Sequence, residues 1–538
     1  MTTLTAPAPQ RAGTLAGTLA LTRLALRLDR VRLPVWIGVA AILPAGTAAQ
    51  YTKLYPDDQA IRAVAGVLTN PSLVAINGPL YRPTLGALTT WKILASEVIL
   101  VALMSIFTVV RHTRTDEEAG RFELTGAGVT GRFAPLTAAL VTAAGANAAV
   151  VVLDALGLAV SGLSPTGSLA LALATGGAGL LFAAIAGVAA QLTESARAAT
   201  GLAVTVLGLS YLLRAAGDAG ASWLGWLSPL GWALRLRPFA GERWWVLGMT
   251  AAAALVCGAV AYALAGRRDL GAGLLPQRPG PAEAAPYLRG TFSLAWRLQR
   301  ALLAGWIAGM ALWGGTLGSA AGGIGDAIVT NHSITDMLTR LGGRKGLADA
   351  FLAAVIGITG ILVAAYAVQA TLRLRGEESA GRLEPILATP AGRIRWALGH
   401  LAFALGGTAV LMAVAGATAG LAYGLTTGDP GGQLLRLTGS ALVQVPAAWV
   451  LAGVGTALFG LLPRFTALAW AALGACALVL EVGALLGVSS WIQDLSPFGY
   501  VPKLPGSPLS TAPILWLVVV AAVLTAAGLT GFRRRDTT

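Results

Sequence analysis

Twelve apolar runs follow one another along the chain, and each is about the length of a membrane-crossing helix. A helix of about 20 apolar residues crosses the roughly 30 Å hydrocarbon core of a bilayer. Six runs precede residue 266 and six follow residue 300, so the pattern predicts an all-α polytopic membrane protein with two six-helix halves. The predicted spans are residues 33–52, 86–110, 134–162, 168–191, 200–217 and 243–265, then 301–322, 350–372, 396–424, 436–462, 467–487 and 513–531.

An amphipathic segment precedes each half. Between residues 14 and 32, arginines at helical spacing oppose leucines, which suits a helix lying in the membrane interface. The string GTLALTRLALR at 17–27 is echoed by GTFSLAWRLQR at 290–300, so we expect two such elbow helices. The expected divisions are a tail and elbow helix (1–32), the first transmembrane domain (33–265), a linker and second elbow helix (266–300), and the second transmembrane domain with a short basic tail (301–538).

Composition supports the membrane assignment, with 56% hydrophobic and 12% charged residues and a mean hydropathy of +0.71. A net charge of +14 would suggest nucleic acid in a soluble chain, but here the arginines gather at the ends of apolar runs. They are typical of cytosolic loops, so we expect both termini in the cytosol and no nucleic-acid partner. The chain begins without a secretory signal. Its two cysteines lie inside apolar runs and its three histidines are scattered, which leaves neither a disulfide framework nor a metal site.

The two halves are expected to share one orientation, because each contains an even number of spans. Such parallel repeats are related by a pseudo-twofold axis along the membrane normal. Loops in corresponding positions of the two halves therefore lie on the same side of the membrane.

A polar segment is repeated on the predicted cytosolic side, between the second and third span of each half. Residues 114–132 (the first repeated segment) and 375–393 (the second) share nine of 19 positions. One copy alone would suit a solvated turn at a membrane end. Two copies that kept acids, arginines and glycines in register, while the spans diverged, indicate that both dock on the same partner surface. The shared positions are Arg114/Arg375, Glu117/Glu378, Ala119/Ala380, Gly120/Gly381, Arg121/Arg382, Glu123/Glu384, Ala127/Ala388, Gly131/Gly392 and Arg132/Arg393.

A second repeat lies on the predicted outer side. SWLGWLSPLGW at 222–232 and SWIQDLSPFGY at 490–500 agree at six positions, each before the last span of its half. Trp and Tyr suit the membrane interface, and the Ser-Pro-x-Gly break bends a short helix. We expect two re-entrant outer segments.

No phosphate-binding GxxxxGK[ST] motif occurs in the sequence. Any nucleotide chemistry must therefore come from another chain. The sequence also offers no catalytic set of paired acids or histidines at one membrane face.

The strings EEAGRFE (117–123), ESAGRLE (378–384), LSPLGW (227–232) and LSPFGY (495–500), with the elbow segments, resemble the permease subunits of type-2 ATP-binding-cassette (ABC) exporters. The twelve-span arrangement is similar to the fused actinobacterial drug and polyketide-antibiotic exporter permeases. The resemblance implies export of hydrophobic or amphipathic compounds across a bacterial plasma membrane. It also implies coupling helices seated on separate ATPase subunits, two copies of one kind, which bind ATP and Mg²⁺ while this chain holds no cofactor. The candidate coupling residues are Arg114, Glu117, Gly120, Arg121, Glu123, Arg375, Glu378, Gly381, Arg382 and Glu384.

Charged residues inside spans cost ~2.5–3.5 kcal/mol on insertion scales, so each suggests a function. Arg214 in the fifth span and Glu481 in the eleventh are candidates for an outer gate across the pseudo-twofold axis. Pairing of Arg214 within its own half, or its extension to the outer surface, is the alternative. Glu97 in the second span either faces the substrate path or makes a structural hydrogen bond, and Asp154 is a further charged residue inside the third span.

Other functions are weighed against this one. A major-facilitator-type proton-coupled transporter also has six plus six parallel spans, but its loop motif contains an Asp-Arg pair that is missing here. A membrane scaffold linked to an ATPase would carry a large outer domain, and no outer loop here is long enough.

Overall fold

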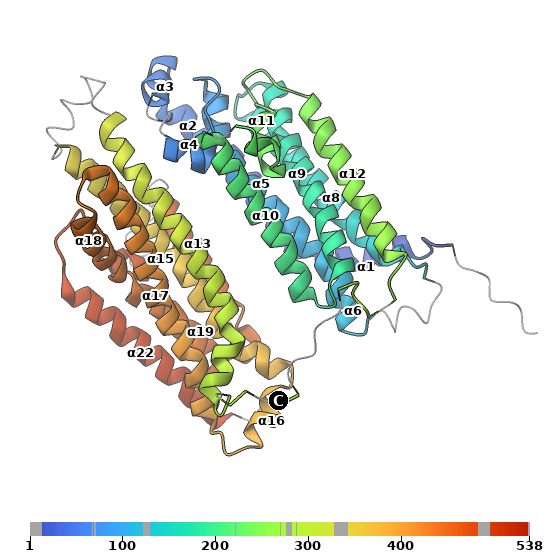
Figure 1. Ribbon diagram of the computed structural model, residues 1–538, viewed down its shortest axis with the longest axis vertical. Coiled ribbons are helices and arrows are strands. Elements are labelled where there is room, and N and C mark those ends of the chain that lie inside the picture. Colours follow the sequence, from blue (N-terminus) through green and yellow to red (C-terminus); the bar gives the residue numbers. More distant parts are fainter. Residues whose placement is uncertain are drawn as a thin grey trace, which may run out of the picture. The chain divides into compact units, whose positions relative to one another are not determined.

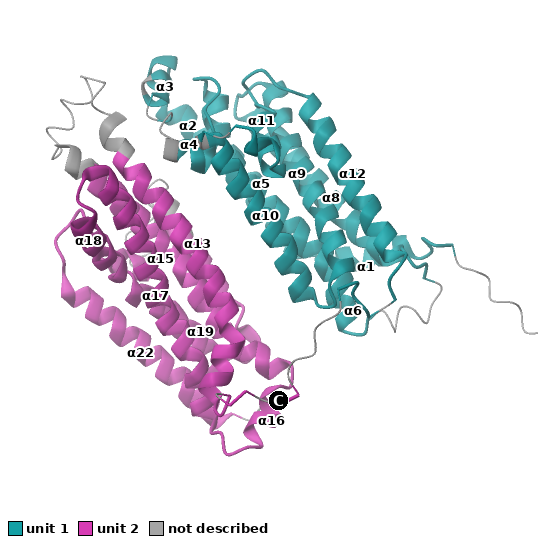
Figure 2. Cartoon of the chain, in the orientation of Figure 1, with its two compact units in different colours: residues 1–280 teal, residues 281–538 magenta. Residues whose placement is uncertain are grey.

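The computed structural model describes residues 13–66, 68, 71–121, 130–220, 222–269, 271–275, 282–283, 285–286, 288–327, 343–482 and 495–535. The chain divides into two compact units, Met1–Gly280 and Pro281–Thr538 (Figure 2). This division lies inside the predicted linker. Within the described residues both units consist of helices and turns without a strand, so the all-α prediction is confirmed (Figure 1).

Unit 1 contains six long helices and several short ones (Figure 1). Its α-helices are α1 (Thr18–Leu28), α2 (Arg32–Leu54), α3 (Asp58–Ala65), α4 (Pro71–Asn77), α5 (Leu85–Val110), α6 (Asp116–Glu118), α8 (Ala134–Val160), α9 (Pro165–Leu192), α10 (Ala196–Ala219), α11 (Pro229–Arg235) and α12 (Trp245–Ala265). A π-helical turn η2 (Arg111–Thr115) joins α5 to α6, and a 3₁₀ turn η3 (Leu224–Trp226) precedes α11.

Unit 2 contains the same kinds of element. Its α-helices are α13 (Thr291–Ala327), α15 (Gly343–Ser379), α16 (Leu383–Leu387), α17 (Arg393–Thr427), α18 (Pro430–Leu442), α19 (Val445–Leu461), α20 (Leu468–Val482) and α22 (Thr511–Arg534), with 3₁₀ turns η4 (Pro463–Phe465) and η5 (Pro497–Tyr500).

Eleven helices in the described part of the chain are long and apolar enough to cross a membrane. They coincide with eleven of the twelve predicted spans. The twelfth prediction, residues 467–487, corresponds to the shorter helix α20 and continues outside the described residues. A multi-pass membrane protein follows from these lengths and compositions.

The two amphipathic segments differ from each other in the structure. The first forms the separate helix α1, which ends at Leu28 before α2 begins at Arg32. The predicted second elbow helix is not separate, because residues 291–300 are continuous with the following span in α13. Pro34 lies in the first turn of α2, where proline is tolerated, and unit 2 has no proline at this junction.

Small residues set how closely the long helices approach. A Cβ added at Gly179 of α9 would lie 1.8 Å from the amide oxygen of Asn147 in α8. In unit 2, a Cβ at Gly318 of α13 would lie 2.2 Å from the carbonyl oxygen of Ala419 in α17. Because glycine has no Cβ, the backbones of these helices can come close together. The close approach fixes the register of the helices.

The first outer repeat folds back against its own unit. Ser228 caps α11 by accepting a hydrogen bond from the amide of Gly231, and Pro229 occupies the first helical position. The helix α11 contacts α5, α9 and α10. In the second outer repeat, residues 490–494 lie outside the described residues, and Pro497–Tyr500 forms η5.

Candidate functional site

The two repeated segments begin with the same backbone turn. In unit 1, α5 continues through η2 into α6, and in unit 2, α15 runs to Ser379. Gly120 and Gly381 then both adopt a φ of +67°, a left-handed conformation that favours glycine. The amide of Gly120 donates to the carbonyl oxygen of Glu117 (3.0 Å), and that of Gly381 donates to Glu378 (2.9 Å). Gly120 and Gly381 are therefore explained by helix termination.

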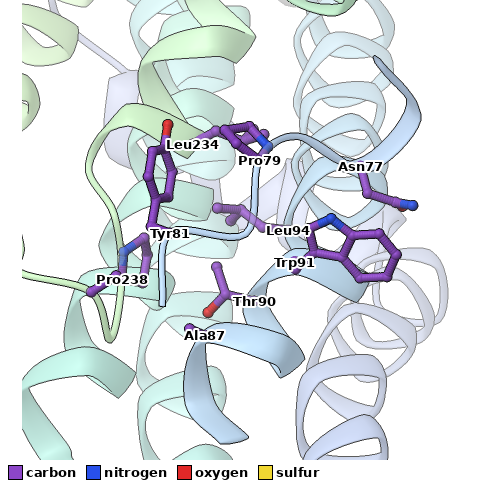
Figure 3. Close-up of a pocket in the computed structure, with 10 residues that line it drawn as sticks. Asn77, Pro79, Tyr81, Ala87, Thr90, Trp91, Leu94, Leu234 and Pro238 are labelled. Carbon is purple, nitrogen blue, oxygen red and sulfur yellow. The ribbon is translucent and has the colours of Figure 1, made fainter. Parts of the chain in front are cut away.

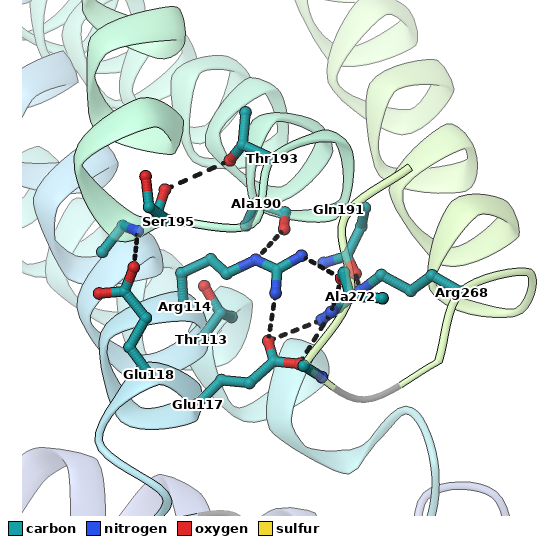
Figure 4. Close-up of polar contacts among 12 residues, drawn as sticks. Thr113, Arg114, Glu117, Glu118, Ala190, Gln191, Thr193, Ser195, Arg268 and Ala272 are labelled. Atoms are coloured by element: carbon teal, nitrogen blue, oxygen red, sulfur yellow. Dashed lines mark hydrogen bonds and ion pairs between the residues drawn. The ribbon is translucent and has the colours of Figure 1, made fainter. Parts of the chain in front are cut away.

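A buried glutamate lies near the start of the first repeated segment. The Glu117 carboxylate, 6% exposed, accepts from Arg114 Nη1 at 3.0 Å and from Arg268 Nη1 and Nη2 at 2.8 and 3.0 Å (Figure 4). The amide of Gly271 donates a further bond at 2.6 Å. We call Arg114, Glu117 and Arg268 the first arginine clasp.

Arg114 ties this clasp to neighbouring backbone. Its Nε donates to the carbonyl oxygen of Ala190 at the end of α9, and its Nη2 donates to Ala272, both at 2.7 Å (Figure 4). Its side chain is only 1% exposed. A guanidinium has five donors in a planar fork, and three of its nitrogens are used here. Arg114 therefore serves the interior of unit 1 and leaves no surface for a partner.

The same arrangement supports the second repeated segment. The Glu378 carboxylate, 3% exposed, accepts from Arg375 Nη1 at 3.1 Å and from Arg535 Nη2 at 2.7 and 2.8 Å. The guanidinium of Arg535 also lies over the rings of Phe459 and Phe532, at 4.9 and 5.4 Å. Arg375, Glu378 and Arg535 form the second arginine clasp.

The last residue of each repeated segment contacts the clasp arginine that follows the last span of its own unit. Arg132 Nη2 donates to the carbonyl oxygen of Arg268 at 2.9 Å, and Arg393 Nη1 donates to that of Arg535 at 2.6 Å. Arg268 and Arg535 thus bind the beginning of the segment through their side chains and its end through their backbone.

The exposed part of each segment carries an ion pair. Arg121, 55% exposed, lies 2.5 Å from Asp116, and Arg382, also 55% exposed, lies 2.6 Å from Glu377. The hydrogen bond to the Glu377 carboxylate raises the pKa of Arg382, so the Arg382 guanidinium stays protonated. Glu384 is exposed, whereas Glu123 lies outside the described residues.

One sequence difference between the segments has a structural counterpart. Glu118 Oε1 accepts a hydrogen bond from the amide of Ala196, at the start of α10, at 2.8 Å (Figure 4). The equivalent residue, Ser379, instead donates to the carbonyl oxygen of Gly376 at 3.4 Å. The first repeated segment therefore contacts the fifth span of its half through a residue that the second lacks.

Arg214, predicted as an outer-gate candidate, is engaged within unit 1. It is fully buried, and its Nη2 donates to the carbonyl oxygens of Ala75 and Ile76, both at 2.8 Å. Asp218 lies 3.6 Å from its Nη1 and 3.5 Å from Arg235. The side chain of Glu481 lies outside the described residues, so the predicted pairing across the halves stays a prediction.

Glu97 and Asp154 are both fully buried, in α5 and α8. Asn147 Nδ2 donates to Ser105 Oγ at 2.9 Å, which fixes the antiparallel register of these helices. Asp154 lies seven residues beyond Asn147, and Glu97 lies eight residues before Ser105, so the two acids occupy the same level. The two carboxyl groups are close enough to interact electrostatically, and none of their four oxygens has a hydrogen-bond partner in the described part of the chain. Glu97 therefore faces another acid inside its own half.

A small cavity lies near the outer repeat of unit 1, between the start of α5 and the loops around α11 (Figure 3). Its volume is about 20 Å³, which is room for a water molecule and far below the size of a drug. It is lined by Asn77, Pro79, Tyr81, Ala87, Thr90, Trp91, Leu94, Leu234, Pro238 and Ala240. This cavity is therefore not a substrate site.

Arg268 and Arg535 are among the arginines at the ends of apolar runs, a pattern that by itself indicates only membrane topology. A local signal was available, because Arg268 is followed by Asp269 and Arg535 by Asp536, directly after the last span of each half. Asp29, which contacts His112 at 2.6 Å, was also missed. No local pattern pointed to that contact.

Comparison with known proteins covers the whole chain. Residues 288–533 match the family model described as the C-terminal domain of the multidrug efflux system permease Rv1217c. Over 532 residues, the chain is 45% identical to the multidrug efflux system permease protein Rv1217c of Mycobacterium tuberculosis. This match covers 98% of the chain and 97% of the relative, and so includes both halves.

Proposed function

The chain belongs to the family of the multidrug efflux system permease Rv1217c, and from this premise we propose that it is the membrane-spanning permease subunit of an ABC exporter. It moves hydrophobic or amphipathic, drug-like or antibiotic-like compounds out of the cell across the plasma membrane. Both termini lie in the cytosol. ATP and Mg²⁺ are bound by separate ATPase subunits, and the energy of ATP hydrolysis reaches the permease through its two repeated segments.

The observation that carries this proposal is the duplicated construction of the repeated segments. Each contains a left-handed glycine and an exposed arginine ion pair, and each is held by a buried arginine clasp. Two segments with the same internal support suit two copies of one ATPase. The clasps attach each segment to the helices of its own half. Such an attachment is required if a displacement of the segment by an ATPase is to move the membrane spans.

The main alternative, a proton-coupled secondary transporter, is less consistent with these findings. The family match is to a permease of an efflux system. The segment between the second and third spans also lacks the Asp-Arg pair of the major facilitator loop.

Photocrosslinking tests the docking of the ATPase. A photoreactive residue is placed at Ala119 or at Ala380, which are exposed and equivalent in the repeat. Leu383 is unsuitable because it is 1% exposed. Capture of one ATPase from both positions is expected, while a probe at Trp223, 64% exposed on the predicted outer side, captures none. Failure of both segment probes to capture an ATPase co-expressed from the same cell would contradict the proposal.

Drug uptake into inverted membrane vesicles separates the two energy sources. Uptake is expected to require ATP and to persist when a protonophore removes the proton gradient. Uptake that proceeds without ATP and stops with the protonophore would favour the secondary transporter.

A further inference from the structure

The two clasps join parts of the chain that are far apart in sequence. Arg268 follows α12, the last span of unit 1, and lies 151 positions from Glu117. Arg535 directly follows α22, the last span of unit 2, and lies 157 positions from Glu378. In both units, the last span is therefore attached to the repeated segment that continues the second span.

The buried glutamate makes this attachment necessary. A carboxylate removed from water is stable only when cations and hydrogen-bond donors surround it. In each unit, one such donor comes from the segment itself and the other from beyond the last span. Separation of the last span from the segment would leave the glutamate with its local arginine alone.

The surroundings of the two clasps differ, although the clasps themselves agree. Arg268 Nε donates to the side chain of Gln191, whereas Arg535 lies over two phenylalanine rings. Because the residues around Arg268 and Arg535 differ, local packing alone does not explain why both arginines form an ion pair with the equivalent glutamate. What the halves share is the connection between segment and last span, at side chain and backbone alike.

We propose that Arg268 and Arg535 are positioning residues for transport, each of which makes the repeated segment and the last span of its half move as one body. When an ATPase displaces the segment, α12 or α22 is displaced together with α5 or α15. This proposal rests on the proposed function and specifies how docking at the segment reaches two spans at once.

The test uses the full chain assembled with its ATPase in lipid nanodiscs or vesicles. The variants are Arg268→Gln and Arg535→Gln, and their matched controls are Arg267→Gln and Arg534→Gln at the exposed arginines immediately before each clasp residue. The measured quantity is the number of drug molecules moved per ATP hydrolysed. We expect the clasp variants to lower this ratio about tenfold and the controls to leave it within about twofold.

Lysine variants supply a readout that depends on geometry. Arg535 reaches both oxygens of Glu378 with the single nitrogen Nη2, so a lysine ammonium can replace it. Arg268 binds Glu117 with two nitrogens and Gln191 with a third, which one ammonium cannot reproduce. Arg535→Lys is therefore expected to keep most of the coupling ratio, and Arg268→Lys to lose it. These variants also decide the matter if a glutamine variant fails to fold.

The possible failures are distinguishable. An unmodified chain that retains no ATPase would overturn the proposed function and this inference with it. ATPase retained by every variant, with an unchanged number of drug molecules moved per ATP, would overturn the positioning role alone.

Discussion

His112 Nε2 lies 2.6 Å from Asp29 Oδ2, and the two side chains are only 5% and 3% exposed. Asp29 caps the C-terminus of α1, and His112 belongs to η2 at the start of the first repeated segment. Arg111 Nε reaches the other oxygen of the same carboxylate at 3.1 Å. The first helix is thus bound to the beginning of η2, directly before the first repeated segment, through one buried aspartate.

Replacement of Asp29 by asparagine is expected to lower the free energy of unfolding by about 1.5–3 kcal/mol, the range for hydrogen bonds to a charged group. Cys257 and Cys476, half-buried and buried free thiols, report unfolding through labelling by a thiol-reactive dye. The exposed neighbour Arg30→Gln serves as the control. An unchanged unfolding midpoint in Asp29→Asn would show that the contact contributes no stability.

Gly120→Ala and Gly381→Ala are each expected to destabilise the protein by about 1–2 kcal/mol. An added Cβ meets no atom within 4 Å at either site, so the cost comes only from the left-handed backbone. Gly376→Ala is the control, because it lies in α15 with equal space and is expected to be neutral or slightly stabilising. The same thiol-labelling measurement applies, and equal effects at all three glycines would refute the backbone explanation.

Glu118→Ala is expected to reduce stability by about 0.3–1 kcal/mol, since a carboxylate at the N-terminus of α10 is lost. Ser379→Ala, at the equivalent position of unit 2, makes no such helix contact and should have a smaller effect. Protease sensitivity at the start of α10 provides a local readout. A larger effect from Ser379→Ala than from Glu118→Ala would contradict the assignment.

At least one of Glu97 and Asp154 is expected to be protonated. None of their four oxygens has a hydrogen-bond partner in the described part of the chain, and two neighbouring ionised acids inside hydrocarbon are strongly disfavoured. Dicyclohexylcarbodiimide, which modifies protonated carboxyl groups in apolar surroundings, should therefore label one of them, as mass spectrometry of the peptides can detect. Glu97→Gln combined with Asp154→Asn should abolish the adduct. Absence of labelling in the unmodified protein would indicate that both acids are ionised.

The helices were largely predictable because the signal for a membrane span is local. A run of apolar residues reports its own burial in lipid, whatever the rest of the chain does. The separate α1 and the continuous α13 show the limit of that signal. Both segments carry the same amphipathic pattern, but only the first ends before the following span begins.

The repeated segments were recognised from their sequence, but the surroundings of their residues were not. Arg114, Glu117 and Glu378 were predicted as coupling residues at a partner surface, and the structure places their side chains inside the clasps. The direct contact with an ATPase therefore stays a prediction for the exposed residues, such as Arg121 and Arg382.

The sequence by itself determined that this is a duplicated multi-pass membrane protein of the ABC exporter permease class, because apolar length, repeat register and short motifs are each legible within a few dozen residues. Only the tertiary structure decided which charges meet. Glu117 with Arg268 and Glu378 with Arg535 depend on the rotation and register of helices distant in sequence. Close packing of small residues across the whole bundle sets that register, and no local pattern records it.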